Sequence, residues 1–174
     1  MALYFRLARA LPRVTGASML GSRLSVPAPL EPLYERYYCW KYGASAAGTI
    51  LNDEICPHLL ELYEIRAAEL DKPLSEVFNG TVYLIPSLKL GRHEAYQVAF
   101  FRDRGIDVRI GHSMATLGAT APVTLAGAVT LNAAEHLALC ILNWAFFDRM
   151  SLDLGCSLAP MDMQTTIRPF GRPE

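Results

Sequence analysis

The strongest constraint on this chain is the apolar run from 121 to 147, APVTLAGAVTLNAAEHLALCILNWAFF. Four polar residues interrupt it: Asn132, Glu135, His136 and Asn143. A surface helix would have a wider polar face, and a charge such as Glu135 is costly inside a membrane span. On a helical wheel, Thr124, Asn132 and Glu135 lie within about 80° of one another. The run therefore predicts a helix, nearly apolar all round, between a sheet and a further helical layer or subunit.

The chain has 174 residues, of which 52% are hydrophobic, so it suffices for one domain with a real core. Sixteen basic and seventeen acidic residues give a net charge of -1, which argues against a nucleic-acid partner. The four cysteines are widely spaced without a CxxC pair. This pattern is typical of reduced thiols and predicts a cytoplasmic protein without a membrane or metal site, since Cys56-Pro57-His58 alone is a weak zinc motif.

Residues 1–30 are basic, with four arginines and no acidic residue before Glu31. This composition suits an amphipathic targeting peptide. It equally suits a basic helix that packs against the rest of a larger protein. A secretory signal is disfavoured because Arg6, Arg9 and Pro12 interrupt the apolar stretch, and the segment stays unassigned.

Residues 31–78 form a helical segment by pattern. The aromatic residues between 34 and 42 predict a packed helix face rather than a ligand cage. A second helix is expected after a cap at Asn52 or Asp53, with apolar residues at helical spacing, and it ends at Lys72-Pro73.

Residues 79–174 alternate between strand and helix patterns. Strands are expected at 81–85, 106–110 and 152–159, with helices over 91–104 and from about Pro122, capped by Thr120. This order predicts parallel βα units, about three of the eight in a (β/α)8 TIM-type barrel. We therefore expect a partial α/β barrel, a piece of something larger, whose open sheet edge promotes self-association.

The segment from 118 to 139, GATAPVTLAGAVTLNAAEHLAL, resembles the signature of the trimethylamine and glycine-betaine corrinoid methyltransferases, the MttB-like family. The similarity extends upstream through IPSLKLGRHEAYQVAFFRDRGIDVRI and more loosely downstream through MDMQT and GRPE. It covers about residues 50 to 174.

This resemblance implies a (β/α)8 barrel that moves a methyl group from a methylamine or quaternary amine, such as trimethylamine or glycine betaine, to the cobalt of a corrinoid. The corrinoid is presented by a partner protein, so no cofactor is bound directly. The full-length form is expected to be a homo-oligomer. The 174 residues alone are expected not to catalyse methyl transfer, because walls of the pocket would be missing.

Barrel chemistry occurs on loops after the strands, which defines the candidate residues; no catalytic residue is assigned. Those expected to face substrate or corrinoid are Ser87, His112, Ser113, Thr120, Asp162 and Gln164. Gly118 and Pro122 are expected to set loop geometry, Gly118 through a positive φ. His112 also suits a structural hydrogen bond, Asp162 a turn cap and Thr120 a helix cap. Glu135 and Asn132 are expected to bind neighbouring backbone, away from the barrel mouth.

Two alternatives to the methyltransferase stay open. One is a truncated, inactive fragment of the same fold with a binding or assembly role. The other is an unrelated α/β enzyme, although the chain lacks GxGxxG, a P-loop and GxSxG.

Overall fold

The computed structural model describes residues 2–11, 25–44, 48–85, 87–112, 114–150 and 158–167. The chain divides into two compact units, one of residues 1–82 and 99–108, the other of residues 83–98 and 109–174. Each unit is described by itself.

The first unit is mainly helical. Its elements are α1 (Ala2–Ala10), the 3-10 turn η1 (Ala28–Leu30), α2 (Glu31–Lys41), α3 (Cys56–Leu70) and α4 (Leu74–Val77). The helices expected over 31–42 and after Asn52 are therefore present, and the side chain of Asn52 accepts from the N–H of Ile55, just ahead of α3.

Aromatic rings form the centre of this unit. The ring of Tyr63 on α3 lies 5.2 Å from Trp40 on α2 and 4.9 Å from Phe78, and Phe78 lies 4.9 Å from Phe101. Trp40 thus belongs to a packed face, as the aromatic pattern of α2 predicts. Phe101 is distant in sequence, so the core of the helical unit includes residues from 99–108.

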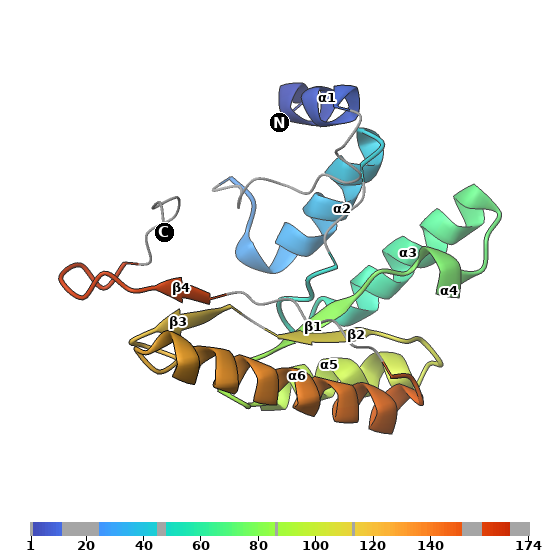
Figure 1. Ribbon diagram of the computed structural model, residues 1–174. Helices are drawn as coiled ribbons and strands as arrows, with labels where there is room; N and C mark the ends of the chain where they lie inside the picture. Colours follow the sequence, from blue (N-terminus) through green and yellow to red (C-terminus); the bar gives the residue numbers. More distant parts are fainter. Residues whose placement is uncertain are drawn as a thin grey trace. The chain divides into compact units, whose positions relative to one another are not determined.

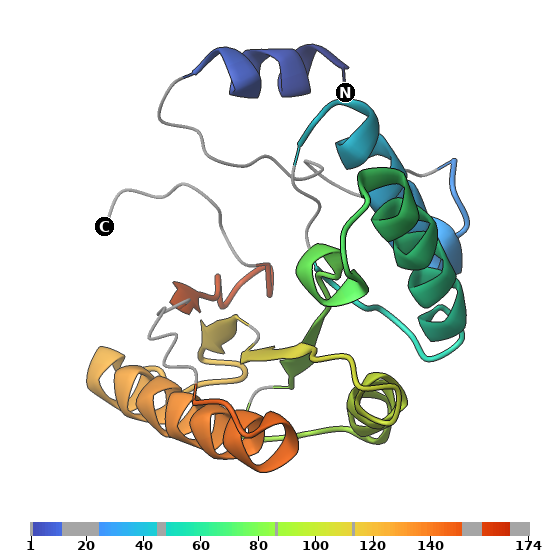
Figure 2. The ribbon, with the colours of Figure 1, turned by 90° about the vertical axis from the view of Figure 1, so that its right-hand side faces the viewer.

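Parallel strands alternate with helices in the rest of the chain, and no barrel closure is seen among the described residues. The elements are β1 (Thr81–Leu84), α5 (Arg92–Arg102), β2 (Arg109–His112), β3 (Ala115–Leu117), α6 (Leu125–Phe147) and β4 (Leu158–Pro160). β1 and β2 form one two-stranded sheet; β3 and β4 form another, in parallel, with Ala115 opposite Leu158. α6 runs alongside β2 and β3 (Figures 1 and 2).

Two strand positions differ from the sequence expectation. The strand expected at 106–110 begins only at Arg109, because Ile106 and Val108 are buried with the helical unit instead of joining the ladder. β3 forms where a loop was expected, since it pairs with β4, far along the chain. Of the strand expected at 152–159, Leu158 and Ala159 belong to β4, and 152–157 lie outside the described residues.

The long helix α6 buries its polar side and exposes an apolar side, the reverse of an ordinary surface helix. Its buried side carries Asn132, Glu135, His136 and Asn143, whereas Leu137, Ile141 and Trp144 on the opposite side are exposed. Of the narrow polar stripe expected from the sequence, Asn132 and Glu135 therefore face inward, whereas Thr124, the cap of the helix, is exposed. Among the described residues, α6 is long and apolar enough to cross a membrane by length and composition, and a third of its most apolar window is buried in the chain.

Candidate functional site

The turn after β3 has the backbone geometry that the sequence predicts. Gly118 has φ +85°, a conformation that strains other residues. Thr120, however, does not cap α6. Its Oγ1 accepts from the N–H of Thr116 at 2.9 Å, which closes the turn.

The cap of α6 is Thr124, whose side chain accepts from the N–H of Gly127 at 3.3 Å. The helix therefore begins at Leu125, and the expected start at Pro122 is wrong. Pro122 precedes the cap and packs close to Gly127, where an added Cβ would lie 2.9 Å from the Cβ of Pro122. Both Thr124 and Thr120 accept hydrogen bonds from backbone N–H groups through their hydroxyl oxygens, and only the structure shows that Thr124, not the expected Thr120, caps the helix.

The turn after β4 is held by Asp162. Its Oδ1 accepts from the N–H of Gln164 at 2.9 Å and of Thr165 at 3.5 Å. This agrees with the structural interpretation of Asp162 as a turn cap. Gln164 is exposed. The ends of β3 and β4 thus carry side chains engaged in local geometry.

The carboxyl ends of β1 and β2 carry a different set of groups. His112 is the last residue of β2, and its ring lies 4.5 Å from that of His136 on α6, edge to face at 78°. Ser87 is exposed in the turn after β1, and Ser113 lies outside the described residues. His112 therefore contacts a second imidazole from another element.

Glu135 joins this end of the sheet. It is only 1% exposed, and its Oε1 accepts from the N–H of Leu88, in the turn after β1, at 3.1 Å. This bond confirms the expectation that Glu135 binds backbone, but Glu135 lies beside the turn that follows β1, at a strand end. The second oxygen, Oε2, is buried and has no hydrogen-bond partner among the described residues.

Asn132 lies one turn before Glu135 on the same helix. It is 4% exposed, and its Nδ2 is buried without a hydrogen-bond partner among the described residues. Residues three apart on a helix are neighbours, with Cβ atoms about 5–6 Å apart. A buried acceptor and a buried donor without partners thus occur close together, and such groups call for an explanation in a folded protein.

Asn143 has a structural role instead. Its Nδ2 donates to the carbonyl of Ile110 at 3.2 Å, and its Oδ1 accepts from the N–H of Ile110 at 3.4 Å. Both backbone groups of a buried strand residue are thereby satisfied, and α6 is fastened to β2. The polar face of α6 therefore combines one residue that fastens it to β2 with two residues, Asn132 and Glu135, that each have a buried polar atom without a partner among the described residues.

The sequence did contain a signal for this cluster. Asn132, Glu135, His136 and Asn143 are spaced by three, one and seven positions, which places them on one side of a helix. The sequence did not show that this polar side of α6 faces β2 and the turn after β1.

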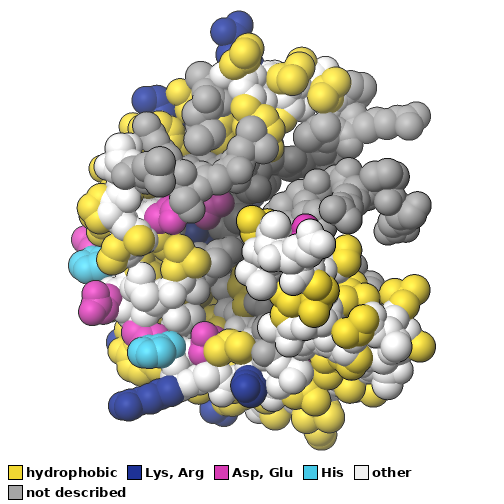
Figure 3. Space-filling model, turned by 90° about the vertical axis from the view of Figure 1, so that its left-hand side faces the viewer, with side chains coloured by type: hydrophobic (Ala, Val, Ile, Leu, Met, Phe, Trp, Pro, Cys, Tyr) yellow, Lys and Arg dark blue, Asp and Glu magenta, His cyan; other side chains and the backbone are white. Residues whose placement is uncertain are grey.

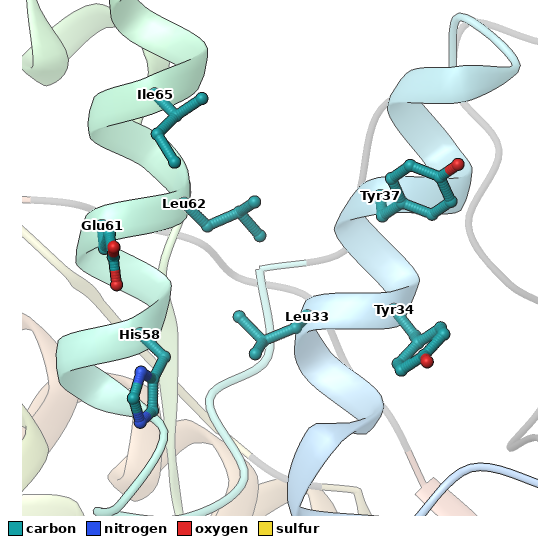
Figure 4. Close-up of a pocket in the computed structure, with 7 residues that line it drawn as sticks. All are labelled: Leu33, Tyr34, Tyr37, His58, Glu61, Leu62 and Ile65. Carbon is teal, nitrogen blue, oxygen red and sulfur yellow. The ribbon is translucent and has the colours of Figure 1, made fainter.

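A separate groove of about 330 Å³ lies in the helical unit, between α2 and α3. Leu33 and Leu62 point toward one another across it, and Tyr34 and Tyr37 lie along its α2 side (Figure 4). The two tyrosine rings do not face each other across an enclosed space, so they form no cage for a cation. This groove supplies apolar surface and little polar chemistry.

Burial raises the pKa of Cys56 to about 12, and the nearby carboxylate of Asp53 acts in the same direction. Cys56 therefore stays a neutral thiol at ordinary pH, which makes it a poor metal ligand. Burial also raises the pKa of the Tyr63 hydroxyl, which donates to the carbonyl of Asn79 at 2.9 Å. Within the described part of the chain, no three His, Cys, Asp or Glu residues gather as metal ligands would.

Comparison with known proteins gives no match to a family model and none to a curated protein.

Proposed function

We propose that the cluster of Asn132, Glu135, His112 and His136 binds a methylated amine, and that the protein is a methyltransferase, or part of one, acting on such amines. The observation that carries the proposal is the buried Oε2 of Glu135, which has no hydrogen-bond partner among the described residues. A buried carboxylate is costly unless a positive group accompanies it. A quaternary or protonated methylammonium supplies that charge.

A betaine would satisfy both groups of the pair. Its ammonium would lie against Oε2 of Glu135, and its carboxylate would accept from Nδ2 of Asn132, one helix turn away. A simple amine such as trimethylamine has no carboxylate and would leave Asn132 without an acceptor. We therefore favour glycine betaine or a similar zwitterion over trimethylamine as the substrate.

The two imidazoles would form a wall of this site. His112 is half-buried at the end of β2, and its ring meets that of His136 at 4.5 Å. A corrinoid, when presented by a partner protein, supplies the reduced cobalt that accepts the methyl group. The half-exposed His112 suits its amide-bearing edge, because imidazole both donates and accepts hydrogen bonds. The contribution of the chain is to bind and orient the amine and to exclude water.

Binding tests this proposal directly. Calorimetric titration with glycine betaine, trimethylamine hydrochloride and neutral tert-butanol should give heat of binding for the first two only, with the betaine bound more tightly. The variant E135Q is the decisive one. Its amide oxygen still accepts from the N–H of Leu88, whereas its charge is lost.

If Glu135 is the counter-ion of the amine, E135Q weakens binding about tenfold or more, which is the range for a charged partner removed from a buried site. Asn132→Ala should weaken the betaine and leave trimethylamine nearly unchanged. Equal betaine affinity in the wild type and E135Q would show that Glu135 only fastens the turn after β1, and the proposal would fail.

A second function is an assembly role without catalysis. The observation that favours it is the exposed apolar side of α6. In that case, none of the amines would bind, and the chain would act through its surface.

A further inference from the structure

The exposed side of α6 is a straight apolar stripe. Six residues recur along it over five helical turns and are exposed: Ala126, Thr130, Ala133, Leu137, Ile141 and Trp144. We name these six residues the outer stripe. Its large members are 60–64% exposed, and hydrophobic side chains gather at the lower right of Figure 3, with few charged groups among them. A contiguous exposed patch of this kind marks an interaction surface.

We propose that the outer stripe binds the outer stripe of a second copy of this chain, with the two α6 helices antiparallel about a two-fold axis near residue 135. In a two-fold interface, the same patch is used on both copies and must complement itself. The inference is independent of the amine site, since the stripe lies on the opposite side of the helix.

The sizes of the side chains meet this requirement. The first half of the stripe is small, with Ala126 and Ala133, and the second half is large, with Leu137 and Trp144. An axis near residue 135 places Ala126 opposite Trp144 and Ala133 opposite Leu137. Leu137 and Trp144 then each meet an alanine, which lets the helices approach closely at these two contacts, and Ile141 falls opposite Val129 by the same count.

The charges of α6 also meet the requirement that the patch complement itself. The sequence has no Asp, Glu, Lys or Arg between Thr124 and Phe147 except the buried Glu135, so no like charges oppose one another. Asp148 is exposed just after the helix. At 1.5 Å per residue, the antiparallel arrangement puts it roughly 4–5 Å beyond the N-terminal end of the partner helix. A carboxylate there is attracted by the positive end of the helix dipole.

The experiment is sedimentation velocity of the full chain over a range of concentrations, with a reciprocal pair of variants. A133L alone opposes leucine to leucine at both sites, and L137A alone leaves a gap at both. The double variant A133L/L137A restores one leucine and one alanine at each contact. Both substituted positions are exposed, so the fold of the monomer is kept.

We expect a monomer–dimer equilibrium for the wild type, a dissociation constant about tenfold higher for each single variant, and a return to within a few-fold in the double variant. D148N should weaken the dimer modestly and reduce its salt dependence. Non-specific association would instead be strengthened by A133L and would not be rescued.

Three outcomes would overturn the inference. They are a monomer at all concentrations up to about 100 µM, a dissociation constant that is the same in the single and double variants, or sedimentation with neutral lipid vesicles in place of self-association. The last would show that the stripe contacts a membrane. Unchanged circular dichroism and urea unfolding in each monomeric variant provide the control for folding.

Discussion

Cys56 illustrates how a single buried side chain responds to its surroundings. With a pKa near 12 in place of 9.0, its thiolate fraction at pH 8 falls about a thousandfold. We expect iodoacetamide to alkylate Cys56 far more slowly in the native protein than in urea, as measured by peptide mass spectrometry. Alkylation at the unfolded rate would contradict its burial.

The same shift predicts a pH dependence of stability. Because the folded pKa of Cys56 is raised, its contribution is fully present below about pH 9 and is lost as pH rises toward about 12. The raised pKa of Tyr63 acts in the same direction. The free energy of unfolding in urea should therefore fall progressively as the pH rises from about 9 toward about 12. The decrease should be smaller in C56A than in the wild type.

Asn143 carries the third prediction at this scale. Asn143→Ala removes both hydrogen bonds to the backbone of Ile110, a residue that is 3% exposed. Two buried polar groups without partners should lower the free energy of unfolding by roughly 2–4 kcal/mol. Ala145→Ser, two positions on and exposed, is the matched control. A loss below about 0.5 kcal/mol in N143A would mean that water replaces the amide.

At the scale of the element, α6 depends on its cap. Thr124→Ala removes the acceptor for the N–H of Gly127 and should cost about 1 kcal/mol, whereas Thr124→Ser keeps the oxygen. Hydrogen exchange at Gly127 should accelerate in T124A alone. In T120A, exchange should change at Thr116, whose N–H donates to that hydroxyl. Faster exchange at Gly127 in T120A would instead show that Thr120 caps α6, as expected from the sequence.

The strands show how far elements are specified locally. Thr81 to Leu84 is an apolar, β-branched run and forms β1 as expected. β3 could not be predicted in this way, because Ala115 to Leu117 resembles a loop until Leu158 to Pro160 pairs with it. Strand formation depends on a partner for the backbone groups, and that partner can be distant in the sequence.

At the scale of the whole molecule, each compact unit is built from two separate stretches of the chain. Residues 99–108 belong with the helical unit, and Phe101 from this segment is fully buried there. We therefore expect a fragment of residues 1–108 to unfold cooperatively in urea, followed by circular dichroism. A fragment of residues 1–82 should lack a sharp transition, because it loses the ring that packs on Phe78. Equal cooperativity in both fragments would argue against this division.

The sequence by itself determined the approximate positions of the helices after residue 30, the alternation of helix and strand, and the polar residues of α6. These features depend on periodicity and on residues such as Gly118, whose effects are local. The tertiary structure alone decided which side of α6 is inside. Burial and pairing depend on contacts between distant residues, so only the folded chain brings Glu135 to the N–H of Leu88 and His136 to His112. For the same reason, an apolar side that the sequence assigned to the interior is exposed on α6.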